Sequence, residues 1–387
     1  ISRLTLTPDG RASETVLLED WCQQFPSHSI GDLVFDRTGA LLVGGGDGAA
    51  YQGLDVGTRG QPFSSCAGDP VAEGGALRAQ DLTTSGDPVT LDGTIARIDP
   101  MTGAAALQNP LASAGGGAAR IISYGLRNPY RFALRPGRNE LWIGDVGWNT
   151  FEEINVTRID QVENFGWPCF EGRAPSRYSR VGSPICGSLY AKPKSVSGPF
   201  FAYPQRAPVV RGEECLTPGA SAISGIAFDA GTSFPAPLDG ALFFADYIRG
   251  CIWAFPPRRF GAPHLGSLRV FQTRSRFPVD LVKGPDGLYY ANIVGGTIQR
   301  VAFVRRTVEA VLRTRPRGLA IGFDGRIERD GTAVTIRPGS EHRLSAAARI
   351  RSRGRRLRFV RWADSGERVR DVAPRDRRTF TAIYRRR

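Results

Sequence analysis

Short apolar runs separated by turn-forming residues are the dominant pattern along this chain of 387 residues. Glycine (47 residues) and proline (27 residues) lie between these runs, and helical periodicity is scarce, so the pattern predicts an all-β protein. One unit, made of an apolar strand, a turn with glycine and a second apolar strand, recurs at residues 32–43, 131–143, 225–244 and 280–290. The units are spaced by close to two, two and one periods of about 50 residues. This period is typical of a β-propeller, in which each blade buries its faces against its neighbours.

The texture of the sequence changes after residue 304. Four further runs alternate apolar and polar residues between turn signals, at residues 318–323, 332–336, 357–362 and 379–384. We therefore predict two domains, a β-propeller at residues 1–304 and a small β-sandwich-like domain at residues 305–387. Residues 160–220 are irregular, and we expect them to form long loops on one rim of the propeller, where binding residues usually lie.

Charge follows the same division of the chain. Residues 305–387 contain 24 arginines and 9 acidic residues, a net charge of +15, so the other residues carry −1 of the total of +14. A small domain with this charge attracts polyanions, which for a secreted protein are anionic polysaccharides or cell-wall polymers. The alternative is a solvated arginine-rich surface with no partner. No zinc-finger spacing, RNA-recognition signature or basic helix is visible, which argues against specific nucleic-acid binding.

The six cysteines indicate the compartment. Their number is even, and they form neither a CxxC pair nor zinc-ligand spacing with a histidine. We expect paired disulfides, and hence a secreted or periplasmic protein; the alternative is six buried thiols in the cytosol. No apolar run approaches the ~20 residues of a transmembrane helix, so the sequence predicts no membrane span.

Few residues are candidates for chemistry. The chain has three histidines, His28, His264 and His342, and histidine is the usual general base near neutral pH. His28 lies just before the first recurring unit, where a lone histidine is more often structural or solvated. The glycine-rich turn at residues 144–149 offers carbonyls and a carboxylate that suit a hard cation such as Ca²⁺, although a plain connecting turn has the same composition.

Four segments taken together resemble a known family. They are His28 with the Gly46-Asp47-Gly48 that follows it, Tyr124-Gly-Leu-Arg127-Asn128-Pro129, the stretch from Gly144 to Asn155, and Asn164-Phe-Gly-Trp167-Pro168. In this order and spacing, residues 28–303 resemble the soluble quinoprotein glucose/sorbosone dehydrogenases, which include aldose sugar dehydrogenases and the propeller of hedgehog-interacting protein. The resemblance implies a six-bladed β-propeller that holds pyrroloquinoline quinone (PQQ) and Ca²⁺ and oxidises an aldose sugar at C1 to the lactone. It does not specify the sugar or the electron acceptor.

The same resemblance assigns roles to individual residues. His28 is expected to be the general base that removes the C1 hydroxyl proton. Arg127 and Asn128 are expected to contact the quinone, where the Arg127 guanidinium would stabilise negative charge that develops on reduction. The backbone carbonyls of Gly147 and Trp148 are expected to bind Ca²⁺, which would act as a Lewis acid.

Two departures from the family pattern concern the cofactor. Ile248 stands where the family has a lysine, and we expect the adjacent Arg249 to serve as a cofactor ligand instead. Residues 277–279 replace an Arg-x-Arg motif, although Arg274-Ser-Arg276 lies three residues earlier and could compensate through a loop shift. PQQ carries three carboxylates, so the loss of cations would weaken its binding. These departures favour the alternative of a non-catalytic propeller that binds carbohydrate or a protein partner, whereas the retained His28, Arg127 and Asn128 favour the enzyme.

One further departure concerns the start of the propeller. The family has about one blade before the segment that contains His28, and this chain shows no counterpart of it. We expect the natural protein to carry this blade and a signal peptide upstream.

Overall fold

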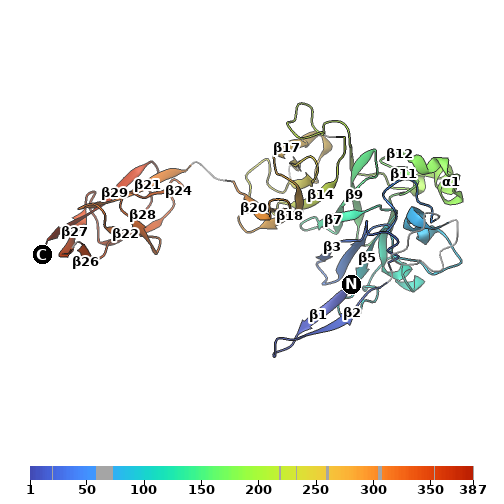
Figure 1. The fold of residues 1–387 in the computed structure, drawn as a ribbon, viewed down its shortest axis with the longest axis horizontal. Helices are drawn as coiled ribbons and strands as arrows, with labels where there is room; N and C mark the ends of the chain where they lie inside the picture. Colours follow the sequence, from blue (N-terminus) through green and yellow to red (C-terminus); the bar gives the residue numbers. More distant parts are fainter. Residues whose placement is uncertain are drawn as a thin grey trace. The chain divides into compact units, whose positions relative to one another are not determined.

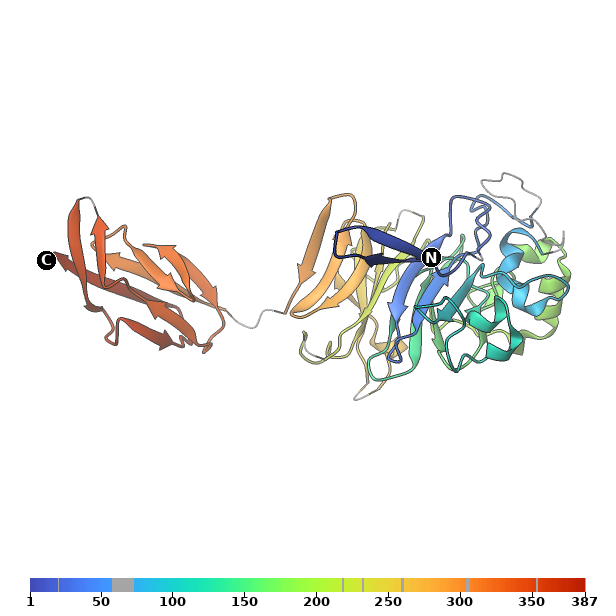
Figure 2. The ribbon, with the colours of Figure 1, turned by 90° about the horizontal axis from the view of Figure 1, so that it is seen from below.

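The computed structural model describes residues 1–19, 21–57, 73–217, 219–231, 233–258, 261–303, 307–352 and 354–386. Its regular structure is almost entirely β, so the predicted all-β class is confirmed (Figures 1 and 2). The described helices are α1 (Pro184–Ala191) and the short 3-10 helices η1 (Gly75–Thr83), η2 (Ala112–Ala114), η3 (Ala118–Arg120), η4 (Arg177–Arg180), η5 (Pro193–Ser195) and η6 (Leu265–Ser267). No helix in this part of the chain is both long enough and apolar enough to span a bilayer.

The chain divides into two compact units, Ile1–Ala302 and Phe303–Arg387. The predicted boundary between residues 304 and 305 falls on residues outside the described ones.

Four antiparallel sheets form most of the first unit. Their strands are, in turn, β3 (Ile30–Phe35), β4 (Leu41–Gly45), β5 (Thr94–Ile98) and β6 (Ile121–Tyr124), with β10 (Glu163–Asn164) added in parallel; β7 (Pro129–Leu134), β8 (Glu140–Asp145), β9 (Phe151–Arg158) and β13 (Phe201–Pro204); β14 (Ile223–Phe228), β15 (Leu242–Asp246), β16 (Cys251–Phe255) and β17 (Arg269–Gln272); and β18 (Pro278–Gly284), β19 (Gly287–Asn292) and β20 (Thr297–Val301). Two hairpins complete the described strands of this unit, β1 (Ser2–Leu6) with β2 (Ala12–Val16) and β11 (Phe170–Glu171) with β12 (Ala174–Pro175).

Each recurring unit of the sequence forms the first two strands of one sheet, so the predicted strand–turn–strand units are confirmed. The first strands pack on one another in sequence order, β3 on β7, β7 on β14 and β14 on β18, as the inner strands of neighbouring propeller blades do. The described residues contain four such sheets, which falls short of the six blades expected. The interpretation of each of the first two spacings between recurring units as two blade lengths is wrong. The sheets on either side of each spacing are direct neighbours, and long loops account for the extra residues.

Buried strands that lie between the two edges of each sheet hold the sheets together. The side chains of β4, β15 and β16 are buried throughout because these strands are covered on both faces. Apolar clusters fill the space between successive sheets; one of them packs Trp142 and Tyr203 of the second sheet against Phe244 and Trp253 of the third. Aromatic rings stack within this cluster, such as Phe244 on Trp253 with 5.2 Å between the ring centroids. Such pairs stabilise the fold beyond what the burial of their apolar surface contributes.

The region predicted as rim loops is a packed layer that contains α1 and the β11–β12 hairpin, and its strands β10 and β13 join the first and second sheets. Disulfide Cys169–Cys186 closes it, and Cys215–Cys251 ties the following loop to the start of β16. Cys22 is also disulfide-bonded, and no described cysteine is free. Paired disulfides are therefore confirmed for the described cysteines, while Cys66 lies outside the described residues.

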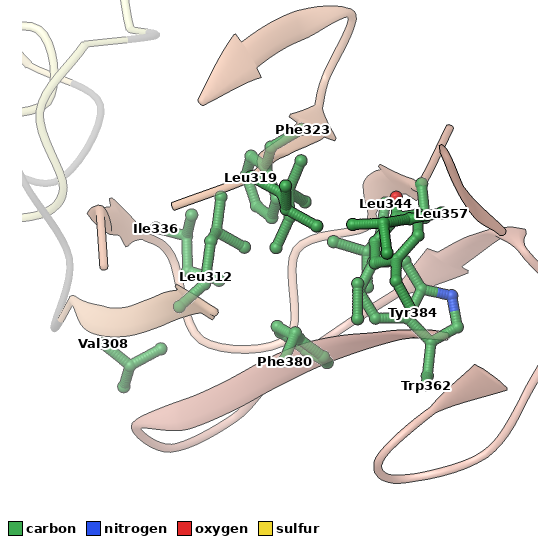
Figure 3. Close-up of a cluster of buried hydrophobic side chains, with 14 residues drawn as sticks. Val308, Leu312, Leu319, Phe323, Ile336, Leu344, Leu357, Trp362, Phe380 and Tyr384 are labelled. Atoms are coloured by element: carbon green, nitrogen blue, oxygen red, sulfur yellow. The ribbon is translucent and has the colours of Figure 1, made fainter. Parts of the chain in front are cut away.

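The second unit consists of two sheets that share one core. The five-stranded sheet runs in the order β24 (Ala333–Ile336), β21 (Val308–Arg315), β29 (Arg378–Arg386), β27 (Arg355–Trp362) and β26 (Arg349–Ser352), and the four-stranded sheet in the order β23 (Arg326–Arg329), β22 (Ala320–Phe323), β25 (His342–Ser345) and β28 (Val369–Val372). Figure 3 shows side chains of the five-stranded sheet, including Leu312, Phe380 and Trp362, facing Phe323 and Leu344 of the four-stranded sheet. Two sheets packed face to face leave each with one outer face in solvent.

Candidate active site

His28 and Asp47 form a buried pair at the end of the first sheet. His28 lies in the loop before β3, and Asp47 follows β4. The antiparallel pairing of Ile30 with Gly45 brings the two loops side by side, so that Nδ1 of His28 lies 2.7 Å from Oδ1 of Asp47. The exposed fractions of the two side chains are 8% and 1%. The pairing of two strands therefore places a histidine beside a carboxylate in a water-poor site.

The backbone of His28 is held in an unusual conformation. Its φ of 53° lies in the left-handed region, which costs a non-glycine residue roughly 1–2 kcal/mol. Gly46 packs directly on this residue, because a Cβ at Gly46 would lie 2.2 Å from the His28 carbonyl oxygen. Strain of this kind persists where the surrounding structure fixes the conformation, and it is concentrated at functional sites.

The protonation state of the pair follows from its contacts. Burial lowers the pKa of His28, and the nearby Arg127 charge lowers it further, so the imidazole is neutral at pH 7. Burial alone would raise the pKa of Asp47, but its electrostatic interaction and hydrogen bond with His28, the Arg127 charge and the hydrogen bond from the backbone N–H of Ala49 hold its pKa below the usual value. An ionised Asp47 can only accept, so Nδ1 of His28 carries the proton and donates it. Nε2 is then the atom with a free lone pair.

Arg127 connects this pair to the loop after β8. Its backbone carbonyl accepts a hydrogen bond from the Asp47 N–H at 2.9 Å, and its guanidinium donates to the carbonyls of Val146 at 3.0 Å and Gly147 at 2.8 Å. The guanidinium also lies over the ring of Trp167, with 5.5 Å from Cζ to the ring centroid, and the Trp167 indole N–H donates to Oδ2 of Asp47 at 2.7 Å. The structure thus joins His28, Arg127 and Gly147, which lie far apart in the sequence, in one cluster.

Asn128 is positioned by its main chain. Its backbone N–H donates to Oδ1 of the buried Asp145 at 2.7 Å, and its carbonyl accepts from the N–H of Val146. The backbone N–H of Arg127 donates to the other Asp145 oxygen at 3.1 Å. Asp145 therefore fixes the turn in which both predicted quinone-contacting residues lie.

The loop of Gly147 and Trp148 is held by two carboxylates. Oε1 of Glu171 accepts hydrogen bonds from four successive backbone N–H groups, those of residues 148–151, at 2.8–3.2 Å. Oε2 of Glu152 accepts from the N–H of Gly147 at 3.2 Å. Gly147 cannot carry a side chain here, because a Cβ would lie 1.5 Å from the carbonyl oxygen of Phe151. The backbone of this loop is therefore preorganised.

Buried carboxylates surround the same loop. Burial raises the pKa of Asp145 to about 7. Burial and the charge of Asp246 raise the pKa of Glu152 to about 8, and burial and the charge of Asp145 raise that of Glu153 to about 8. Hard oxygen donors of this kind suit a divalent cation such as Ca²⁺.

The donor set fits a cation and an anionic cofactor with one condition. The Gly147 carbonyl, a predicted Ca²⁺ ligand, already accepts a hydrogen bond from Arg127, so a cation bound there must share this oxygen with the guanidinium or displace it. Within the described residues, the guanidinium of Arg78 also approaches this cluster, 3.4 Å from the Asp47 carbonyl oxygen. The Arg127 guanidinium beside the pair suits a carboxylate of an anionic ligand, whereas Arg78 is buried and lies 3.7 Å from Oδ1 of Asp92.

The structure does not bring Arg249 to this cluster. Arg249 is 1% exposed, and its guanidinium donates to the Ser221 hydroxyl at 2.6 Å and to the carbonyls of Ala207 and Pro204. Carboxylates of Glu213 and Asp246 lie 3.8 and 4.0 Å away. With its donors used in this buried network, Arg249 is placed as a structural residue, and the expectation that it replaces the family's lysine as a cofactor ligand is not supported by these contacts.

Sequence analysis missed two residues of the site. The role of Trp167 depends on a contact across 120 positions of sequence, and that of Glu171 on contacts across 20 to 23 positions. Neither residue type in its segment signals such a contact, although Trp167 belongs to one of the four matching segments.

Residues 2–291 match the glucose/sorbosone dehydrogenase family. A stretch of 60 residues is 40% identical to aldose sugar dehydrogenase YliI of Escherichia coli, and it covers 16% of each chain.

Solved structures show a weaker likeness. The PQQ-bound aldose sugar dehydrogenase of Streptomyces coelicolor is 17% identical with a TM-score of 0.46, and the match covers 75% of this chain and 64% of that one. The apo-form of the soluble aldose sugar dehydrogenase of Escherichia coli is 22% identical with a TM-score of 0.44, over 75% of this chain and 73% of that one. This chain thus spans less than two thirds of the Streptomyces enzyme. Since the family match covers most of the residues of this chain, the chain belongs to the glucose/sorbosone dehydrogenase family.

Proposed function

We propose that this protein is a PQQ- and Ca²⁺-dependent dehydrogenase that oxidises an aldose sugar at C1 to the lactone. The observation that carries the proposal is the buried His28–Asp47 pair, joined through Arg127 to the Gly147 loop. Membership of the family and the PQQ in the related Streptomyces enzyme support the choice of cofactor.

The residues of the chain would divide the work as follows. Nε2 of His28 accepts the proton of the C1 hydroxyl, while Asp47 holds the ring in the required tautomer and stabilises the imidazolium that forms. The Arg127 guanidinium offers charge to an oxygen that becomes negative. PQQ and Ca²⁺, when bound, supply a two-electron acceptor for the C1 hydride. Asn128 and the carbonyls of Gly147 and Trp148 are proposed to hold these groups.

Sugar-dependent dye reduction tests the proposal. The full chain is supplied with PQQ and CaCl₂, and reduction of an artificial electron acceptor is followed with a panel of aldoses. The matched control is His342→Ala, because His342 also pairs with an aspartate at 2.7 Å but belongs to the second unit. His28→Ala should abolish the signal and His342→Ala should retain it. The absence of dye reduction with every aldose, together with an unchanged PQQ spectrum, would refute the proposed dehydrogenase activity.

A second candidate function is a non-catalytic propeller that binds carbohydrate or a protein partner. The engagement of Arg249 in a buried network favours it, because the site then has one cation fewer for a trianionic cofactor. Sugar binding by calorimetry without any dye reduction would support this candidate over the enzyme.

The remaining proposals concern location and partners. The disulfides support a secreted or periplasmic protein. We also propose that the basic second unit binds an anionic polysaccharide or cell-wall polymer, which its net charge of +15 supports.

A further inference from the structure

The arginines of the second unit are concentrated on one sheet face. In an antiparallel pair, residues opposite each other project from the same face, and Arg349 pairs with Arg358 and Arg351 with Arg356. Arg358 also pairs with Arg385 on β29, which extends this face to a third strand.

The parallel pairing of β29 with β21 extends the face to a fourth strand, because Arg313 pairs with Thr381 and Arg315 with Ile383. Arg361 pairs with Ile383 from the other side. We call this surface the arginine face, and its arginines are Arg313, Arg315, Arg349, Arg351, Arg356, Arg358, Arg361 and Arg385. All eight are exposed, and the opposite face of the same strands forms the core seen in Figure 3.

The arginine face lacks compensating charge. The ion pairs of this unit that the structure describes involve other basic residues, among them Arg370, Arg377 and Arg378. In the five strands of the sheet, Glu309 is the one acidic residue, and it pairs with Arg377. The other acidic residues lie in the second sheet and in loops. The positive charge is therefore both unpaired and directed to one side.

Such an array opposes folding. Like charges directly opposite each other on neighbouring strands are destabilising. Residues two apart along a strand are about 6.7 Å apart and neighbouring strands about 4.8 Å apart, so these charges lie within the Debye length of ~8 Å at physiological salt. A bound polyanion would remove this repulsion, and Arg349, Arg351, Arg356 and Arg358 already line a hollow of about 240 Å³.

The chemistry of the face selects among polyanions. The aromatic side chains of these strands, such as Phe359, Trp362 and Tyr384, belong to the core, so the face offers no ring on which a base could stack. The strands present no helix to a DNA groove, and among their described residues Val360 is the one exposed large apolar side chain, which is too little to enter a lipid layer. Arginine forks match carboxylates and phosphates in bidentate geometry, and of these we choose the carboxylates of acidic polysaccharides. The disulfides of the first unit point to an extracellular setting, where acidic polysaccharides occur.

We propose that the arginine face is a binding site for a linear polysaccharide whose sugars carry carboxylates. This inference rests on the proposed polyanion binding of the second unit and specifies its face and its ligand class. It is independent of the proposed dehydrogenase activity.

The test uses the full chain and polygalacturonate, with neutral dextran as the control ligand, and measures the dissociation constant by calorimetry as a function of NaCl. Arg351→Gln/Arg356→Gln removes one opposed pair of the face. Arg326→Gln/Arg329→Gln removes the same charge from β23 of the other sheet. An arginine near an anionic surface contributes enough that the first variant should bind about 10- to 30-fold more weakly, with the control within about threefold of wild type. The first variant should also melt no lower than wild type, because repulsion is relieved.

Each contrary outcome has a distinct meaning. No binding of polygalacturonate by the unaltered chain would refute both the polyanion proposal and its site. Equal weakening by the two variants would refute the arginine face while leaving polyanion binding by the unit standing. Equally tight binding of a DNA duplex, or of vesicles of anionic phospholipid, at the same salt concentration would overturn the choice of polysaccharide. Dye reduction should be unchanged in both variants.

Discussion

Replacement of Asp47 by asparagine tests the general-base assignment most directly. Asp47 accepts from His28 and Ala49 through Oδ1 and from Trp167 through Oδ2. The asparagine oxygen can serve only one of these sides. Because two donors converge on the Oδ1 side, the oxygen should remain there, and the new NH₂ group should face the indole N–H of Trp167.

Two separate effects follow from that geometry, one on turnover and one on stability. Two unit charges about 4 Å apart interact by roughly 4 kcal/mol at an effective dielectric constant of ~20, so loss of the Asp47 charge removes up to that much stabilisation from the imidazolium of His28. The retained neutral hydrogen bond offsets part of the loss, and we expect turnover to fall about 10²-fold. Separately, the buried Trp167 N–H loses its acceptor, which should lower the free energy of unfolding by about 1–3 kcal/mol.

The double variant Asp47→Asn/Trp167→Phe separates the two effects. Phenylalanine removes the unpaired N–H, so part of the lost stability should return while turnover stays low. Turnover is measured by dye reduction and stability by urea titration. The acid limb of the pH–rate profile should also move to lower pH in Asp47→Asn, because Asp47 is a negative charge that favours protonated His28. A single variant within about threefold of wild-type turnover, or a double variant that recovers turnover together with stability, would show that Asp47 acts on folding alone.

Four further predictions follow from the site. His28→Ala should lower turnover by at least about 10²-fold with PQQ binding nearly unchanged, and a loss below about threefold would make the histidine structural. Removal of Ca²⁺ by a chelator should abolish activity and lower the melting temperature, since a ligand of the folded state stabilises it; unchanged melting would count against a cation at the Gly147 loop. Gly147→Ala should disrupt that loop, because its Cβ would overlap the Phe151 carbonyl, and weaker Ca²⁺-dependent stabilisation is the expected readout; an unchanged calcium titration would contradict it. The metal-free protein should lose stability as the pH rises from about 4.5 to about 8, because the pKa of Glu153 is raised in the folded state, and thermal melts of Glu153→Gln should show a smaller slope; an equal slope would exclude Glu153 as a source.

The strand units could be predicted from the sequence, but the number of blades could not. Apolar–polar alternation and a turn glycine are local signals, so each strand pair appeared where it was expected. The spacing between units adds the lengths of the blade and of its loops, and the long connection between β4 and β5 has the length of a second blade. A period by itself therefore cannot distinguish an added blade from an inserted loop.

The candidate site shows a similar division. His28, Arg127 and Gly147 were found because each lies in a distinctive local segment, and the structure joins them. Glu171 was not found, because its position beside the Gly147 loop is set by the packing of distant segments. Arg249 shows a further limit: it occupies the position next to the expected one, and neighbouring residues in extended or turn segments direct their side chains differently.

The order of strands within the four sheets has a consequence for how the first unit folds. Most strands pair with the strand next to them in sequence, so a sheet can form from one short stretch of chain before it meets its neighbour. Local pairing of this kind keeps the entropy of loop closure low, and units that touch only their neighbours behave nearly as a one-dimensional array. The exceptions are β10, which pairs with β6, and β13, which pairs with β9, each across a long stretch of chain. The sheets should therefore open one at a time. Amide hydrogen exchange should detect this, with the amides of β10 exchanging before those of β4 and β15.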